Sequence, residues 1–347
     1  MNLYVHFPFC RAKCAYCALH SRAGASRSVR EAYVARLVRE ISELPPLKTV
    51  YFGGGTPALC ELSPLKLPLA AGAEFTVELH PLDVTPAKLD ELRLLGVNRI
   101  SMGVQSLDNA VLTAMGRGHT AEQAETAFRR VREVFPNAGL DLIAGWPGVT
   151  DEMWRETLTR ALALEPVHIS CYTLIREAHT LLDRRVREGR YTLPDDDAAL
   201  AQITVAAEAF AAVGLRRYEV SNYALEGREC RHNLAVWRGE DYRGLGDGAH
   251  GREGRFRTIG NSGEYERTEV TELEDVLERT LLALRTSEGI NLEEVKRRFP
   301  QLTERIPIWR ERLTTLSAEG ILEHHGLNTF APNARGFEVC DAVMAEM

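Results

Sequence analysis

The sequence predicts an α/β protein built on a partial, TIM-like (β/α)6 barrel, with a small C-terminal α+β domain. Short, apolar, β-prone segments alternate with helical segments about six times, which indicates a parallel sheet with right-handed crossovers. Polar or glycine-rich residues stand at the C-terminal ends of the expected strands, as in β/α barrels, whereas an open doubly wound sheet would gather them at one switch point. Eight such units cannot be counted within the 347 residues.

The expected strands are short and apolar, and the first of them ends at Pro8. The strands are Leu3–Phe7, Thr49–Phe52, Glu74–Leu79, Arg99–Val104, Leu140–Ala144 and His168–Thr173. The helices are identified by apolar residues at helical spacing, such as Tyr33, Leu37 and Ile41 in the first one. They are expected at Ser28–Leu44, Pro86–Leu95, from Asp108, and at Ala121–Phe135, Asp151–Leu164 and Asp195–Val213.

The pattern changes after about Tyr218, which predicts a division into residues 1–218, 219–271 and 272–347. The stretch Glu219–Gly251 has no clean period and is expected to be a long functional connection. The last part is expected to contain helices at Glu272–Arg285, Leu292–Phe299 and about Ile308–Gly320, a hairpin-like Ile321–Pro332 and a last helix. This order is winged-helix-like. Its arginines are balanced by glutamates, which favours packing on the barrel or on a partner over DNA binding.

Composition and charge exclude several classes of function. The chain is 45% hydrophobic and 26% charged, and its net charge of −7 argues against nucleic acid as a partner, because phosphate binding needs a basic face. No secretory signal pattern and no run of about 18 apolar residues are found. Seven cysteines, an odd number, fit a reducing cytoplasm.

Three cysteines, Cys10, Cys14 and Cys17, form a C-x3-C-x2-C motif directly after the first strand. Zinc fingers and ribbons normally carry a second cysteine pair, and the other four cysteines of this chain are isolated. Three thiolates on a four-iron cluster would leave one iron open to a small molecule. The spacing resembles the signature of the radical S-adenosylmethionine (SAM) superfamily, in which SAM chelates that iron; Tyr16 fits the aromatic residue that commonly precedes the third cysteine.

Further motifs follow later strands. The run from Gly53 to Pro57, GGGTP, lets backbone amides approach a ligand closely, although a glycine run can also be only a tight turn. The densest late motif is Cys230–Trp237, CRHNLAVW, followed by GLGDGAHG. Its histidine could ligate an iron porphyrin and its tryptophan could stack on the flat face, while a structural histidine and a packed tryptophan remain the alternative.

Taken together, these motifs resemble the oxygen-independent coproporphyrinogen III oxidase family of radical SAM proteins. The agreement covers nearly the whole chain, in YVHFPFC-x3-C-AY-C, GGGTP, GVQS, GRGHT, LDLIAGWPG, HISCYTL, YEVSNYA, CRHNLAVW and GLGDGAHG. In this family the oxidase carries a fourth cysteine two residues after the third, where this chain has Leu19, and a longer N-terminal arm. The heme chaperone branch lacks that cysteine and carries H-N-x-x-Y-W, which this chain matches except for Val236. Ala144 also stands where many relatives have tyrosine.

The resemblance implies a role for each matching residue, and none of them is assigned a catalytic one. The [4Fe-4S] ligands would be Cys10, Cys14 and Cys17. The SAM pocket would be lined by Tyr4, Tyr16, Gly54, Gly55, Thr56, Glu78, Gln105, Arg117 and Asp141, with Glu78 a candidate for the ribose hydroxyls. The heme candidates are His232, Asn233 and Trp237, with His250 and Cys230 as weaker ones.

Two functions remain open. In the first, the protein is a heme chaperone that binds a [4Fe-4S] cluster, SAM and heme and delivers heme to a hemoprotein. Its partners would be that client, an electron donor for the cluster and, through the client, a peripheral membrane contact. In the second, it is an enzyme, a coproporphyrinogen III oxidase (dehydrogenase) that uses SAM radical chemistry for oxidative decarboxylation in porphyrin biosynthesis. Leu19 and the short N-terminus favour the first.

Overall fold

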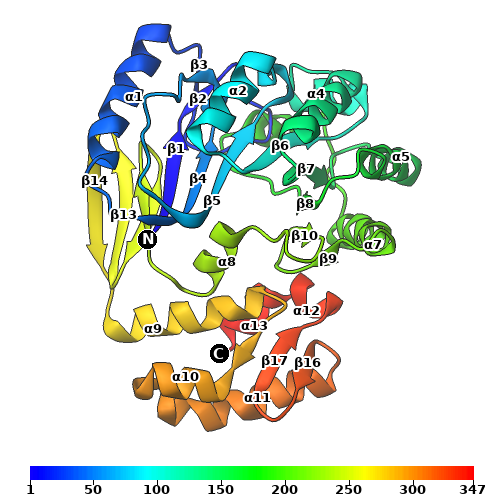
Figure 1. Cartoon of the computed structure of the whole chain (residues 1–347). Helices are drawn as coiled ribbons and strands as arrows, with labels where there is room; N and C mark the ends of the chain where they lie inside the picture. Colours follow the sequence, from blue (N-terminus) through cyan, green and yellow to red (C-terminus); the bar gives the residue numbers. More distant parts are fainter.

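The computed structural model describes residues 1–347 and is organised around one large sheet (Figure 1). Six strands run parallel and lie side by side in the order in which they occur in the chain. They are β1 (Asn2–Phe7), β4 (Leu47–Gly54), β5 (Leu69–Leu79), β6 (Arg99–Gln105), β7 (Ala138–Ala144) and β8 (His168–Thr173). The expected series of six parallel strands is therefore confirmed.

Helices cover the outer face of this sheet (Figure 1). They are α1 (Arg27–Ile41), α2 (Pro86–Leu95), α3 (Asn109–Met115), α4 (Ala121–Val134), α5 (Asp151–Leu162) and α7 (Asp196–Ala212). Each begins after a Ser, Thr or Asp whose side chain accepts a backbone N–H at the third helical residue, the most effective N-terminal cap. The β4–β5 crossover has only a short 3-10 helix at Pro57–Leu59, and the short α6 (Leu181–Arg187) was not anticipated.

The two faces of the sheet differ in polarity. The outward side chains, such as Val50, Phe52 and Phe75, belong to a core of 50 buried residues under the helices. The alternate side chains point to the concave face, because successive residues of a strand face opposite sides. These inward residues are mostly polar: Asn2, Tyr4, His6, Thr49, Tyr51, Glu74, Thr76, Glu78, Arg99, Ser101, Asp141, His168 and Ser170. A polar interior is suited to binding ligands.

The sheet continues at both edges beyond the six parallel strands. On one side β10 (Asn222–Ala224) and β9 (Arg216–Arg217) are antiparallel. On the other side β11 (Tyr242–Leu245) lies parallel to β1 and is followed by an antiparallel series. That series is β12 (His250–Glu253), β13 (Phe256–Asn261) and β14 (Glu264–Glu269). The region from 219 to 251, expected to be a long functional connection, holds the strands β10 and β11, the start of β12 and the helix α8 (Arg231–Trp237).

The C-terminal residues have their own hydrophobic core of 13 buried residues, which includes Trp309 and Phe330. Its helices are α9 (Glu272–Leu281), α10 (Leu292–Arg298), α11 (Ile306–Ala318), α12 (Ala334–Glu338) and α13 (Cys340–Ala345). Its sheet has the order β15 (Ile290–Asn291), β17 (Thr329–Pro332), β16 (Leu322–His325), and the last two form the expected hairpin. This part lies beyond α8 (Figure 1). The three-part division of the chain remains a prediction.

None of the helices combines the length and the apolar character that a membrane crossing requires.

Candidate functional site

The cysteine loop leaves the C-terminal end of β1 and is closed at its base. Cys10 lies in β2 (Phe9–Cys10), which pairs with β3 (Arg22–Ala23), so residues 10–23 form one closed excursion. The Ala15 amide donates to the carbonyl of Met115 at 2.8 Å, which fixes the loop to the end of α3. Cys10, Cys14 and Cys17 are all free thiols, partly exposed, and they line a cavity of about 680 Å³.

The glycine run after β4 packs against the base of this loop. The Gly55 amide donates to the Phe7 carbonyl at 2.8 Å. A Cβ at Gly55 would stand 2.6 Å from the Phe9 carbonyl oxygen and 3.0 Å from the Cys10 sulfur, and Gly54 has a φ of 104°. A side chain at Gly55 would push the two loops apart, and one at Gly54 would overlap the His6 ring, so this close approach is one that glycine alone permits.

Two half-buried carboxyl groups, one near the end of β5 and one in the middle of β7, face the cavity. Glu78 accepts hydrogen bonds from the Tyr51 hydroxyl at 2.9 Å and from the Gly54 amide at 3.1 Å. Burial, with the neighbouring Asp141 as the second cause, raises the pKa of Glu78 to about 7. Asp141 accepts from the Ser101 hydroxyl at 2.9 Å, and burial raises the pKa of its carboxyl as well. Both groups line the cavity that the cysteines line.

Arg117 supplies a buried positive charge beside the cysteines. Its guanidinium donates to the carbonyl of Gly103 and lies 3.5 Å from the Cys14 sulfur. Gln105, which lines the same cavity, has a positive φ of 70°, an uncommon conformation for a residue with a side chain.

The residues present fit an iron–sulfur cluster better than a single metal ion. No three side chains of His, Cys, Asp or Glu converge closely enough to hold one ion. A cube of four irons and four sulfides holds its thiolates farther apart than one ion does, and all three cysteines border one open cavity. Tyr16, Gly54, Gly55, Thr56, Glu78, Gln105, Arg117 and Asp141 line that cavity with them. The structure thus brings the expected SAM-pocket residues together, with one exception.

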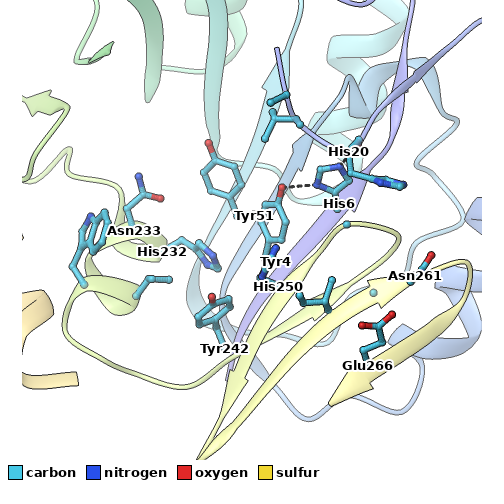
Figure 2. Close-up of a pocket in the computed structure, with 17 residues that line it drawn as sticks. Tyr4, His6, His20, Tyr51, His232, Asn233, Tyr242, His250, Asn261 and Glu266 are labelled. Carbon is cyan, nitrogen blue, oxygen red and sulfur yellow. Dashed lines mark hydrogen bonds between the residues drawn. The ribbon is translucent and has the colours of Figure 1, made fainter. Parts of the chain in front are cut away.

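The exception is Tyr4, which lines a second cavity, of about 880 Å³ (Figure 2). Its hydroxyl is 3.0 Å from Nδ1 of His6, whose Nε2 is 2.7 Å from the His20 carbonyl oxygen. Tyr4 stands two residues before His6 on β1 and points into the barrel, below the strand end where the cysteine loop begins. Its expected contact with SAM remains a prediction.

The second cavity lies between β1, α8 and the β11–β14 extension. His232, Asn233 and Trp237, the heme candidates, all line it, together with Val236 and His250. The cavity is further lined by the unanticipated residues His6, Ala18, Leu19, His20, Tyr51, Tyr242, Gly248, Ile259, Gly260, Asn261 and Glu266. Cys230 is not among these residues; it is fully buried, with its sulfur 3.6 Å from Glu74.

His232 is held at the wall of this cavity. Its backbone amide donates to Glu74 at 3.0 Å, and its Nδ1 is 2.9 Å from the Thr49 hydroxyl oxygen. Its ring lies between those of Tyr51 and Tyr242, at centroid distances of 5.5 and 6.4 Å (Figure 2). Burial, with the Arg99 charge as the second cause, lowers the pKa of His232 to about 3, so the imidazole is neutral at pH 7.

Trp237 closes one side of the cavity at the end of α8. Its indole N–H donates to the Glu219 carboxylate at 3.1 Å, so its polar atom is satisfied away from any ligand. The Arg285 guanidinium lies 5.3 Å from the ring centroid. The ring is thereby fixed from two directions, which leaves a flat aromatic surface at the cavity wall.

The two cavities are neighbours. Ala18 and Leu19 line both, and Leu19 is 54% exposed. The hydrogen bond between Tyr51 and Glu78 joins a residue of the second cavity to a residue of the first. One tyrosine thus contacts both the expected SAM-binding carboxylate and the His232 ring.

Comparisons with protein families, curated sequences and solved structures all identify radical SAM proteins as relatives. The sequence model of the radical SAM superfamily matches residues 4–161. The heme chaperone HemW of Lactococcus lactis is 33% identical over 97% of this chain and 94% of its own, and that of Bacillus subtilis is 35% identical over 86% of each. Among solved structures, the coproporphyrinogen III oxidase HemN of Escherichia coli matches 99% of this chain and 89% of its own with a TM-score of 0.83, at 19% identity, so this likeness concerns the fold alone.

Proposed function

The chain belongs to the HemW family of radical SAM proteins, and from this we propose that it is a heme chaperone that binds a [4Fe-4S] cluster, SAM and heme and delivers the heme to a hemoprotein. Membership in the radical SAM superfamily implies that the protein binds a [4Fe-4S] cluster and SAM. The assignment of each ligand to a particular cavity is our inference from the geometry described above.

We assign the iron–sulfur cluster and SAM to the cavity of about 680 Å³. Cys10, Cys14 and Cys17 would hold the cluster, which supplies one-electron chemistry to a SAM bound at its open iron. Gly54, Gly55 and Thr56 line the same space, and the absence of side chains at the two glycines leaves room for the polar end of SAM. Glu78 is suited to the ribose, because a carboxylate accepts hydrogen bonds from a pair of hydroxyls.

We assign heme to the cavity of about 880 Å³. Aromatic and aliphatic side chains suit a flat macrocycle, and a neutral imidazole such as that of His232 is a common ligand of heme iron. Cavities of this size hold small-molecule ligands and cofactors in other proteins. The single observation that carries the proposal is the presence of His232, Asn233 and Trp237 on the wall of one cavity adjoining the cysteine loop.

The competing function is that of an oxygen-independent coproporphyrinogen III oxidase, and Leu19 argues against it. This position, where the oxidase motif has its fourth cysteine, carries an exposed apolar side chain between the two cavities. The leucine side chain extends the apolar wall of the second cavity. We therefore favour heme binding over porphyrinogen decarboxylation, with a hemoprotein client and an electron donor as the protein's partners.

Two assays on the same anaerobically reconstituted protein test this proposal. Titration with hemin is expected to give a saturable Soret band at one heme per chain, and incubation with coproporphyrinogen III, SAM and a reductant is expected to give no product. A His232→Ala variant should lose most of the Soret shift, whereas a variant of the exposed His325 serves as a matched control. Conversion of coproporphyrinogen III without any Soret band would refute the chaperone proposal.

A further inference from the structure

We propose that Thr49 and Asn2 are positioning residues that hold His232 with its proton on Nδ1, so that Nε2 offers its lone pair to heme iron in the cavity of about 880 Å³. This inference rests on the proposed function for the identity of the ligand. The proton on Nδ1, in contrast, follows from a count of hydrogen atoms in the protein alone.

The side-chain amide of Asn2 has only one possible orientation. Its Nδ2 lies 3.2 Å from a carboxylate oxygen of Glu240 and 3.1 Å from the carbonyl oxygen of Asp241. Both of these atoms only accept hydrogen bonds, so the group facing them must be the amide nitrogen. The Oδ1 of Asn2 is therefore the atom that faces Thr49.

The next link is the hydroxyl group of Thr49. Its oxygen is 2.9 Å from Oδ1 of Asn2, and because Oδ1 only accepts, the single hydroxyl hydrogen is donated to it. The same hydroxyl oxygen lies 2.9 Å from Nδ1 of His232 and has no second hydrogen to give. Nδ1 must then be the donor and carry the proton. Nε2 faces no acceptor in the protein, and a second proton on this buried ring would have no partner, so Nε2 bears a lone pair.

The remaining ring nitrogen is available to a ligand. Nε2 of His232 makes no hydrogen bond with the protein, and it is not among the buried polar atoms that lack a partner, so it retains contact with the cavity space. Figure 2 shows the ring at the cavity wall between Tyr51 and Tyr242. Histidines that bind metals through one nitrogen typically donate the other N–H to a fixed acceptor, which sets the ring orientation and raises the ligand's basicity.

We call the hydrogen-bond chain Asn2–Thr49–His232 the relay, and the pairing of β1 with β4 positions its first two members. Asn2 and Thr49 face each other in the register of β1 and β4, and Asn2 is also the register partner of Tyr242 on β11. Both relay side chains are buried, each at 3% exposure. Neither touches the cavity itself, so their effect on a ligand would pass through His232.

The test compares Thr49→Val, Thr49→Ser and the control Thr76→Val. Valine keeps the branched shape of threonine without its hydroxyl, and serine keeps the hydroxyl. Thr76 is a fully buried inward threonine whose hydroxyl faces Arg99 and makes no hydrogen bond to His232. The first readout is the ¹⁵N spectrum of the histidine rings in heme-free protein, with the His232 signals assigned by a His232→Gln variant. The second is heme affinity from the Soret band.

We expect the Nδ1–H form in wild type, Thr49→Ser and Thr76→Val, and loss of the single tautomer in Thr49→Val. Heme affinity should fall about 10- to 100-fold in Thr49→Val alone. An Nε2–H ring in wild type, or unchanged tautomer and affinity in Thr49→Val, would overturn the inference while leaving the proposed function intact. An Nδ1–H ring in a wild-type protein that binds no heme would overturn the proposed function, and with it the ligand role of His232, but not the relay.

Discussion

Replacing Glu78 by glutamine should change how the stability of this protein depends on pH. Burial and the nearby Asp141 raise the pKa of Glu78 from its ordinary value of 4.5 to about 7 in the folded protein. A carboxyl group with a raised folded-state pKa binds its proton more tightly when folded, so its stabilising effect is complete below pH 4.5 and is lost as the pH rises through about 7. Glutamine does not titrate, and it can donate to the Tyr51 oxygen while accepting from the Gly54 amide.

The size of the effect follows from the two pKa values. The full difference corresponds to about 3 kcal/mol, of which about 2.5 kcal/mol falls between pH 5 and pH 8. These are upper limits, because Glu78 borders a cavity that water can enter. With an unfolding entropy of about 2.1 cal/mol/K per residue, 2.5 kcal/mol corresponds to about 3 °C in the thermal midpoint of a chain of this length.

Thermal unfolding of the metal-free protein at pH 5, 6, 7 and 8 measures this difference. Between pH 5 and pH 8 the midpoint of wild type should fall by up to about 3 °C more than that of Glu78→Gln. The exposed Glu43→Gln variant is the control and should follow wild type. Parallel curves for wild type and Glu78→Gln would show that this carboxyl group is already ionised well below pH 7.

Three further predictions concern other parts of the chain. Cys14→Ser should lose most of the iron and sulfide found in reconstituted wild type, and full retention in a chemical assay would exclude Cys14 as a cluster ligand. Gly55→Ala should destabilise the fold by about 1–3 kcal/mol and reduce cluster content, because its Cβ would overlap the Phe9 carbonyl. Gly118→Ala should do neither, because a Cβ at that position would lie 3.5 Å from the Leu82 side chain, an ordinary contact distance. Trp309→Ala should cost about 3–5 kcal/mol in urea unfolding of the C-terminal part, and a loss below about 1 kcal/mol would contradict its place in that core.

The sequence was informative where burial imposes a pattern. Strands such as β1 and β6 are short apolar runs, and α5 and α7 have capping residues at the expected start, so their bounds agree closely with the expectation. The extension β12–β14 was missed for the opposite reason. All six residues of β14 are exposed, so neither alternation nor an apolar run identifies it. The Ser262-Gly263 turn between β13 and β14 was the available signal for a hairpin.

The same distinction applies to the candidate sites. The cysteine loop and the strand-end residues could be identified because each stands at a motif with its own chemistry. Thr49, Tyr51 and His6 could not, because a polar residue within a strand shows its role only when the facing strand is known. Tyr4 is an example: the sequence places it near the cysteines, whereas in the structure it lines the cavity that borders α8 and β11.

The position of β1 between β4 and β11 also sets an order of events during synthesis of the chain. One edge of β1 can pair as soon as residue 54 is made, whereas the other edge must wait for Tyr242, 240 residues after its partner Asn2. At about 5–20 residues per second, that edge stays open for about 10 to 50 s. An open strand edge can pair with other chains, so β1 is the segment most in need of protection during that interval. The wall formed by β11–β14 is the last part of the large sheet to be made, and a nascent chain can therefore complete its cysteine loop well before it can enclose a ligand in the second cavity.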